Sequence, residues 1–147
     1  MFEIFRTPVE AWVLSIFGIT LAPLMEELYF RGFLYPVLER YIGLAAAFVL
    51  RRRMEIADAI ALKQYIATSA AIVLTAAPFA LLHGAQLKFA WGPVLVIFLV
   101  GAALGTVRAV TDSVAAGLLV HVAYNATISI LMFVATDGFR HLERLNQ

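Results

Sequence analysis

Residues 64–87, QYIATSAAIVLTAAPFALLHGAQL, contain no Asp, Glu, Lys or Arg, and this stretch decides the fold class. Two further charge-free stretches follow it, from Phe89 to Val107 and from Ser113 to Thr136. A bilayer core of about 30 Å needs roughly 20 apolar residues in a helix. Because each stretch has about that length or more, the sequence predicts three membrane-spanning helices.

The first 50 residues contain two more apolar segments. A charge-free run extends from Ala11 to Met25, and the segment from Gly32 to Leu50 is interrupted by only one acid and one base. Pro23 removes a backbone donor inside a helix, so we expect two helices with a hinge near Ala22 and Pro23. The sequence thus predicts an all-α fold, a polytopic membrane helix bundle of about five hydrophobic helices.

The composition supports a membrane protein and excludes several kinds of chemistry. Apolar residues make up 63% of the chain and charged residues 14%, with a mean hydropathy of +0.89, whereas soluble domains have about 45–50% and about 25%. The net charge of +1 gives no reason to expect a nucleic-acid partner. The chain has no cysteine, which excludes disulfides, thiol catalysis and cysteine-based metal sites.

Six polar side chains lie within or beside the predicted spans: Glu26, Glu27, Arg31, His83, His121 and Asn125. A charged side chain at the bilayer centre costs about 2.5–3.5 kcal/mol, so we expect these groups to form an active-site cluster inside the bundle. The spacing supports this expectation, because Glu27 and Arg31 are four residues apart, as are His121 and Asn125. Residues at this interval share one face of a helix.

A carboxylate, two imidazoles and an amide suit hydrolysis. A Glu can take a proton from water as a general base, and one His can share that water or protonate the leaving amine. The second His and Asn125 can donate hydrogen bonds to the oxyanion, which is worth about 3–4 kcal/mol per donor. The same Glu with two His could instead ligate zinc, which activates bound water. The residues leave both mechanisms open.

Three short motifs occur in order on apolar segments. Residues 26–31 read EELYFR, residues 79–83 read FALLH, and residues 121–125 read HVAYN. They resemble the Glu-Glu-x-x-x-Arg, Phe-x-x-x-His and His-x-x-x-Asn motifs of the CPBP family. This is the CAAX protease and bacteriocin-processing group, also called the ABI or type II CAAX-prenyl endopeptidase family. The resemblance implies an intramembrane endopeptidase with an all-helical core.

The resemblance also implies a role for the main polar residues. Glu26 would be the water-activating carboxylate, together with His83, and His121 with Asn125 would form the oxyanion side. On this basis we expect a glutamate-type enzyme that requires no cofactor. The alternative is a zinc enzyme in which Glu26, His83 and His121 bind the metal.

Glu27 and Arg31 would support these residues in the site that the resemblance implies. Arg108, in contrast, is expected to extend to the lipid head groups. The expected partners are the lipid bilayer and a polypeptide substrate in or near the membrane. The substrate would be a CAAX-type protein or a bacteriocin or pheromone precursor.

The whole chain, residues 1–147, is interpreted as a single CPBP-like transmembrane domain with a motif core at about 21–130. A charged insertion is expected at about 51–64 and a polar tail at 136–147. The insertion contains three consecutive arginines, residues 51–53, and the positive-inside rule places this loop in the cytoplasm. We expect an integral membrane protein of a bacterial-type cell membrane.

Two hypotheses from other functional classes remain. A non-catalytic membrane protein, such as an immunity or scaffold factor, could keep the same fold. A proton- or ion-coupled transport fragment is the other, because intramembrane Glu and His also build relays. A transport function predicts a row of polar side chains across the whole bundle, whereas the sequence indicates a single polar cluster.

Overall fold

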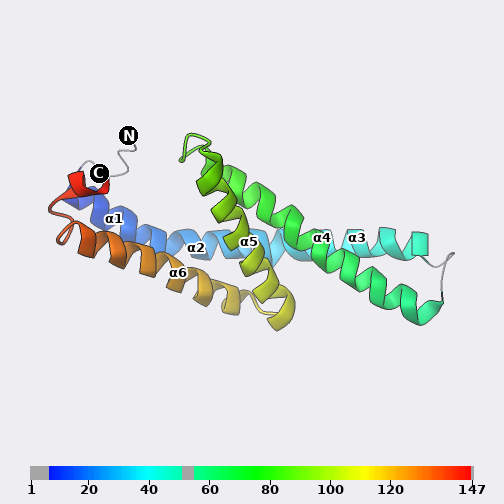
Figure 1. Cartoon of the computed structure of the whole chain (residues 1–147). Helices are drawn as coiled ribbons and strands as arrows, with labels where there is room; N and C mark the ends of the chain where they lie inside the picture. Colours follow the sequence, from blue (N-terminus) through cyan, green and yellow to red (C-terminus); the bar gives the residue numbers. More distant parts are fainter. Residues whose placement is uncertain (1–6, 51–54, 147) are drawn as a thin grey trace. The chain divides into compact units, whose positions relative to one another are not determined.

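The protein is all-helical in the residues that its computed structural model describes, 7–50 and 55–146. The elements are α1 (Pro8–Ile19), α2 (Leu21–Glu27), the π-helix η1 (Leu28–Leu34), α3 (Tyr35–Leu50), α4 (Ile56–Gly84), α5 (Trp91–Thr111), α6 (Val114–Ala135) and the 3-10 helix η2 (Leu142–Asn146) (Figure 1). Four helical stretches are long and apolar enough to cross a membrane: Pro8–Leu50, Ile56–Gly84, Trp91–Thr111 and Val114–Ala135. The prediction of a polytopic all-α membrane protein is confirmed. The two helices expected in the first 50 residues belong to one stretch of 43 residues.

The break in this long stretch lies at Thr20, between α1 and α2, and not at Ala22 and Pro23. Pro23 is buried within α2. A proline lacks the N–H that would donate to the carbonyl four residues earlier, here that of Ile19. The helix is therefore interrupted one turn before the proline, which explains why the hinge precedes its expected position.

The π-helix η1 carries Arg31 and was not predicted. A π-helix changes the backbone hydrogen-bond pattern, and such segments occur frequently at functional sites. The Nε–H of Arg108 donates to the backbone carbonyl of Arg31 at 3.2 Å, and the Arg108 guanidinium also pairs with Asp112. The Arg108 side chain is only 14% exposed and donates to a carbonyl of the π-helix, and its expected extension to the head groups stays a prediction.

The described part of the charged stretch after α3 is mainly helical. Residues 51–54, which include the three arginines, lie outside the described residues, and their cytoplasmic placement stays a prediction. From Ile56 the chain is already in α4, and the charged insertion expected at about 51–64 stays a prediction. A helix of 29 residues is about 43 Å long, more than the hydrocarbon core needs. Asp58 and Lys63 therefore lie on a helical extension with room to project beyond the bilayer.

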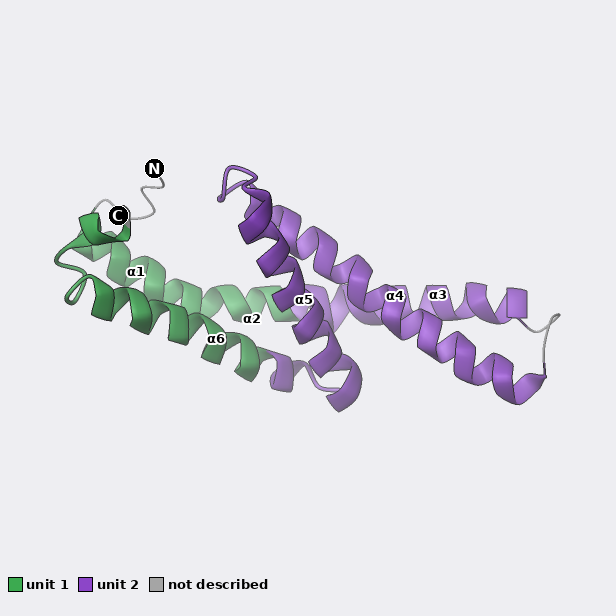
Figure 2. Cartoon of the chain, in the orientation of Figure 1, with its two compact units in different colours: residues 1–27, 118–147 green, residues 28–117 purple. Residues whose placement is uncertain are grey.

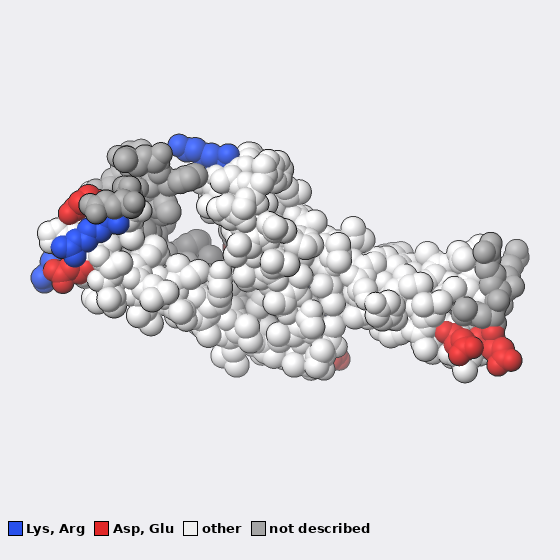
Figure 3. Space-filling view, viewed as in Figure 1, with Lys and Arg blue, Asp and Glu red and all other residues white. Residues whose placement is uncertain are grey.

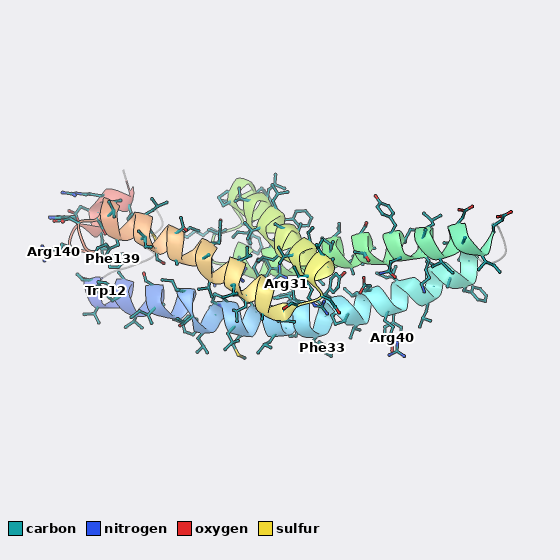
Figure 4. All side chains as sticks on the ribbon, turned by 90° about the horizontal axis from the view of Figure 1, so that it is seen from below. Trp12, Arg31, Phe33, Arg40, Phe139 and Arg140 are labelled. Carbon is teal, nitrogen blue, oxygen red and sulfur yellow. The ribbon has the colours of Figure 1, made fainter. Side chains whose placement is uncertain are left out.

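The chain divides into two compact units, residues 1–27 with 118–147 and residues 28–117 (Figure 2). The single domain expected from the sequence stays a prediction. In the first unit, the ring of Trp12 lies 5.4 Å from that of Phe133 and 5.3 Å from that of Phe139 (Figure 4). This aromatic cluster ties the start of α1 to the segment that follows α6.

In the second unit, α4 packs against both α3 and α5 (Figure 1). Two glycines of α5 allow the close approach. A Cβ atom at Gly101 would lie only 3.0 Å from the Phe79 ring, and one at Gly105 would lie 3.4 Å from Ile72. Small residues at an interval of four are a common device for close packing of membrane helices.

The acid of α3 is satisfied by hydrogen bonds within the second unit. The Oε1 atom of Glu39 accepts from the Tyr35 hydroxyl at 3.0 Å, the Thr68 hydroxyl at 2.7 Å and the Gln64 amide at 3.2 Å. Three donors on one carboxylate oxygen offset the cost of placing it between apolar helices. This explains how a span tolerates an acidic residue without a catalytic role.

The visible surface of both units is largely uncharged, and acidic side chains gather where α4 begins (Figure 3). Many large apolar side chains are exposed along the helices, for example Phe48, Leu99 and Leu131 at 58–64% of their area. A soluble protein rarely exposes so much contiguous apolar surface, whereas lipid covers it at no cost. The protein is an integral membrane protein.

Candidate functional site

The central feature of the first unit is a histidine held between two carboxylates. The Nδ1 atom of His121, on α6, lies 3.0 Å from Oε1 of Glu27, and its Nε2 atom lies 3.6 Å from Oε2 of Glu26. His121 is 3% exposed and Glu27 is fully buried, while the Glu26 side chain is 25% exposed. Consecutive residues of a helix differ in direction by about 100°, which lets α2 place one carboxylate on each nitrogen of the ring.

The two contacts of His121 differ in kind. An ionised carboxylate only accepts hydrogen bonds, so His121 Nδ1–H donates to Glu27. This bond fixes the ring orientation and, in the neutral imidazole, leaves the lone pair on Nε2. The separation of 3.6 Å between Nε2 and Glu26 exceeds the usual 2.7–3.2 Å of a direct hydrogen bond. A polar pair at such a distance is suited to a bridging water.

Asn125 lies one turn along α6 from His121. Its Nδ2 donates to the backbone carbonyl of Gly18 at 2.7 Å. Gly18 is in the last turn of α1, where carbonyls lack the donors of a continuing helix. An amide nitrogen carries two N–H groups, so one of them remains for a ligand. Asn125 and Gly18 also line a pocket between α1 and α6.

In the second unit, Arg31 is fully buried (Figure 4). Its Nη2 donates to the carbonyl of Gly101 at 2.8 Å, and its guanidinium carbon lies 4.7 Å from the centre of the Phe79 ring and 5.8 Å from that of Phe30. A carbonyl and two aromatic faces thus hold this cation. The expected pairing of Arg31 with Glu27 stays a prediction.

His83 lies in the last turn of the long helix α4, which belongs to the second unit. Its Nδ1 is 2.8 Å from the carbonyl oxygen of Phe79, and its ring is 4.8 Å from that of Phe79. Because a carbonyl only accepts, Nδ1 carries the proton and Nε2 is the acceptor in the neutral ring. His83 therefore has the tautomer of a general base, and its predicted place beside Glu26 stays a prediction.

The structure brings Glu26, Glu27 and His121 together and places Asn125 on the next turn. Sequence reasoning missed two further residues of this region, Ser15 and Gly18. Gly18 contributes a backbone carbonyl, which carries no signal in a sequence. Ser15 could have been noticed as a polar residue within the apolar run of α1.

A metal site would need a group of suitable donors among the described residues. No group of three or more His, Asp or Glu side chains there could hold a metal ion. A catalytic zinc site uses three protein ligands. In the first unit Glu26 and the Nε2 atom of His121 would supply two, because Nδ1 is engaged by Glu27. The third ligand of the zinc alternative, His83, lies in the second unit, so this alternative stays a prediction.

A comparison with protein families identifies the chain. The model of the family described as type II CAAX prenyl endopeptidase Rce1-like matches residues 8–127, which is most of the chain and includes all three motifs. No curated protein and no solved structure matches. The chain belongs to the type II CAAX prenyl endopeptidase Rce1-like family, a family of membrane proteases.

Proposed function

We propose that this protein is an intramembrane endopeptidase of the glutamate type that cleaves membrane-associated polypeptides. The observation that carries the proposal is the position of His121 between Glu26 and Glu27 on helices that cross the membrane. Ionisable groups are costly in this environment and mark functional sites by default. The family membership supports proteolysis as the activity.

The geometry suggests how the water is activated. Glu26 Oε2 and the lone pair of His121 Nε2 are both acceptors, 3.6 Å apart. A water that donates one proton to each atom satisfies both. Glu26, the more exposed of the two carboxylates, takes a proton as the water oxygen attacks the peptide carbonyl carbon. The protonated Glu26 then delivers that proton to the leaving amine nitrogen.

The remaining residues stabilise charge and fix geometry. As the carbonyl oxygen becomes an oxyanion, the second N–H of Asn125 donates to it. Glu27 acts as a positioning residue, because its hydrogen bond orients His121. His83, with its acceptor Nε2, is the predicted second base for the water, as the sequence motif implies. We propose that no metal takes part.

The substrate class follows from the family. Its description names a CAAX prenyl endopeptidase, and we propose a prenylated CAAX C-terminus as the substrate. Bacteriocin or pheromone precursors are the other candidates. Each of these polypeptides would reach the site from the membrane. There, peptide groups that lack hydrogen bonds must find partners in the protein.

We expect the purified protein in lipid nanodiscs to cleave an S-farnesylated peptide that ends in a CAAX sequence. Mass spectrometry would show two fragments that together carry one added water. The rate should stay unchanged after treatment with 1,10-phenanthroline, since no metal is required. Loss of activity that returns on adding zinc would establish the zinc mechanism instead. Equal cleavage of the unprenylated peptide would contradict the proposed substrate class.

Replacing Glu27 by Gln should lower kcat about 100-fold or more while KM changes little. Gln keeps the size of the side chain but lacks the charge that holds His121 Nδ1–H. Steady-state kinetics on the farnesylated peptide would measure the split between kcat and KM.

The chain offers a matched control for this variant. His141 Nδ1 lies 3.0 Å from Glu143 Oε1, the same contact in an exposed position. Hydrogen bonds from the backbone N–H of Glu143 and from the His141 side chain lower the pKa of the Glu143 carboxyl. Glu143→Gln should leave kcat unchanged. A larger change in KM than in kcat for Glu27→Gln would argue against a positioning role.

A further inference from the structure

The pocket between α1 and α6 has a volume of about 170 Å³ and lies wholly within the first unit. Its polar lining is Ser15, Asn125 and Ser129, and its apolar lining includes Leu14, Ile128 and Met132. A cavity of about 150 Å³ admits benzene. The pocket therefore has room for a group the size of one amino-acid residue, and none of these six side chains is charged.

Ser15 is the unusual residue of this lining. It is only 7% exposed, and within the described residues its hydroxyl has no hydrogen-bond partner. The helical threonines of the described residues behave differently, since each of their hydroxyls has an acceptor. Thr68 donates to Glu39, and the others donate to the carbonyl four residues earlier: Thr75, Thr106, Thr111 and Thr127. Leaving a buried hydroxyl unsatisfied is costly. The Ser15 hydroxyl is thus available to a ligand.

The chemistry of the lining selects the kind of ligand. A hydrocarbon chain would leave the Ser15 hydroxyl unsatisfied, and no cation is present for a phosphate head group. Hydroxyls and an amide match a neutral dipolar group that both donates and accepts. A peptide bond inside a membrane is such a group, and it must find its partners in the protein. Asn125 belongs both to this pocket and to the proposed oxyanion site.

We propose that this pocket binds a backbone peptide group of the substrate, next to the bond that is cleaved, and that Ser15 is its hydrogen-bonding partner. This inference rests on the proposed function. Leu14, Ile128 and Met132 contact the apolar part of the same substrate residue. Ser15 is a substrate-binding residue that the three motifs do not contain.

Binding of an uncleaved peptide tests the inference without requiring catalysis. In a Glu26→Gln background, fluorescence anisotropy would report the Kd of a labelled S-farnesylated CAAX peptide. Ser15→Ala should weaken binding about three- to tenfold, the value of one neutral hydrogen bond. Ser69→Ala, a half-buried serine of α4 in the other unit, is the matched control and should leave Kd unchanged. An unchanged Kd for Ser15→Ala would overturn the inference, even if the wild-type protein cleaves the peptide.

A substrate series identifies the peptide group. Esters replace the peptide bonds of the probe one at a time, which removes one N–H and weakens one carbonyl. At the position that Ser15 contacts, the ester and Ser15→Ala should not act additively, whereas at other positions their effects on Kd should multiply. Multiplied effects at every position would mean that Ser15 does not bind the backbone.

A thiol at position 15 provides a second measurement. Because the chain has no cysteine, Ser15→Cys introduces a single reactive site. The farnesylated peptide should slow labelling of this thiol by N-ethylmaleimide at least several-fold, and should leave Ser69→Cys unaffected. Protection by added phosphatidylcholine, with no further effect of the peptide, would assign the pocket to lipid. Absence of labelling without peptide would show a closed pocket, and both results contradict the inference.

Discussion

Replacing Glu26 by Gln will lower kcat for peptide cleavage about 100- to 10,000-fold, the range that a general base contributes. Gln has nearly the same shape but cannot take a proton from water. The effect on folding should be small, because Gln has nearly the size of Glu and the Glu26 side chain is 25% exposed. Single-turnover cleavage of the farnesylated peptide, with circular dichroism of the same sample, would separate chemistry from folding.

Glu39→Gln is the matched control for Glu26→Gln, because it also removes a membrane-embedded carboxylate. Its three hydrogen-bond donors come from α3 and α4, and we assign it no part in the reaction. It should retain most of the wild-type kcat. Full activity of Glu26→Gln would reject the proposed base. If the protein protects cells from a bacteriocin and Glu26→Gln still does so, the non-catalytic immunity hypothesis gains support.

The membrane fold could be predicted because its main signal is local. A charge-free run of about 20 residues has few alternatives to a spanning helix. The positions of the charged residues were therefore enough to predict the membrane spans of α4, α5 and α6. The π-helix was not predictable in this way. Leu28–Leu34 has the composition of an ordinary apolar helix, and its carbonyl at Arg31 is served by Arg108, which is distant in sequence.

Four of the six residues predicted for the site lie in the first unit, namely Glu26, Glu27, His121 and Asn125, but the sequence did not predict how they pair. The spacing of His121 and Asn125 placed both on one helix face, but it could not say which groups they meet. His121 meets Glu27, 94 positions away, and Asn125 meets a backbone carbonyl 107 positions away. Such partners depend on how α6 packs against α1 and α2, which no local pattern encodes. Ser15 did carry a local signal, as a polar residue within an apolar run, but its place in a pocket with Asn125 depends on the same packing.

Arg31 shows that a residue of the sequence motif can also stabilise the fold. Replacing it by Ala should destabilise the protein by about 3 kcal/mol or more, which corresponds to a fall of roughly 10 °C in Tm. A charge-assisted hydrogen bond contributes about 1.5–3 kcal/mol, and a desolvated cation–π contact adds about 2 kcal/mol. Both are present, since the guanidinium donates to Gly101 and lies over Phe79. Thermal unfolding in detergent, followed by circular dichroism, would measure the change.

Two variants decide whether this loss comes from the guanidinium itself. Arg31→Lys keeps the charge and can still donate to the Gly101 carbonyl, but it lacks the planar group that stacks on Phe79. We therefore expect its Tm to fall between those of the wild type and Arg31→Ala. Arg40→Ala removes an exposed arginine of α3 (Figure 4) and should leave Tm unchanged. If Arg31→Ala unfolds at the wild-type temperature but loses activity, Arg31 acts in the reaction and the structural role proposed for it is wrong.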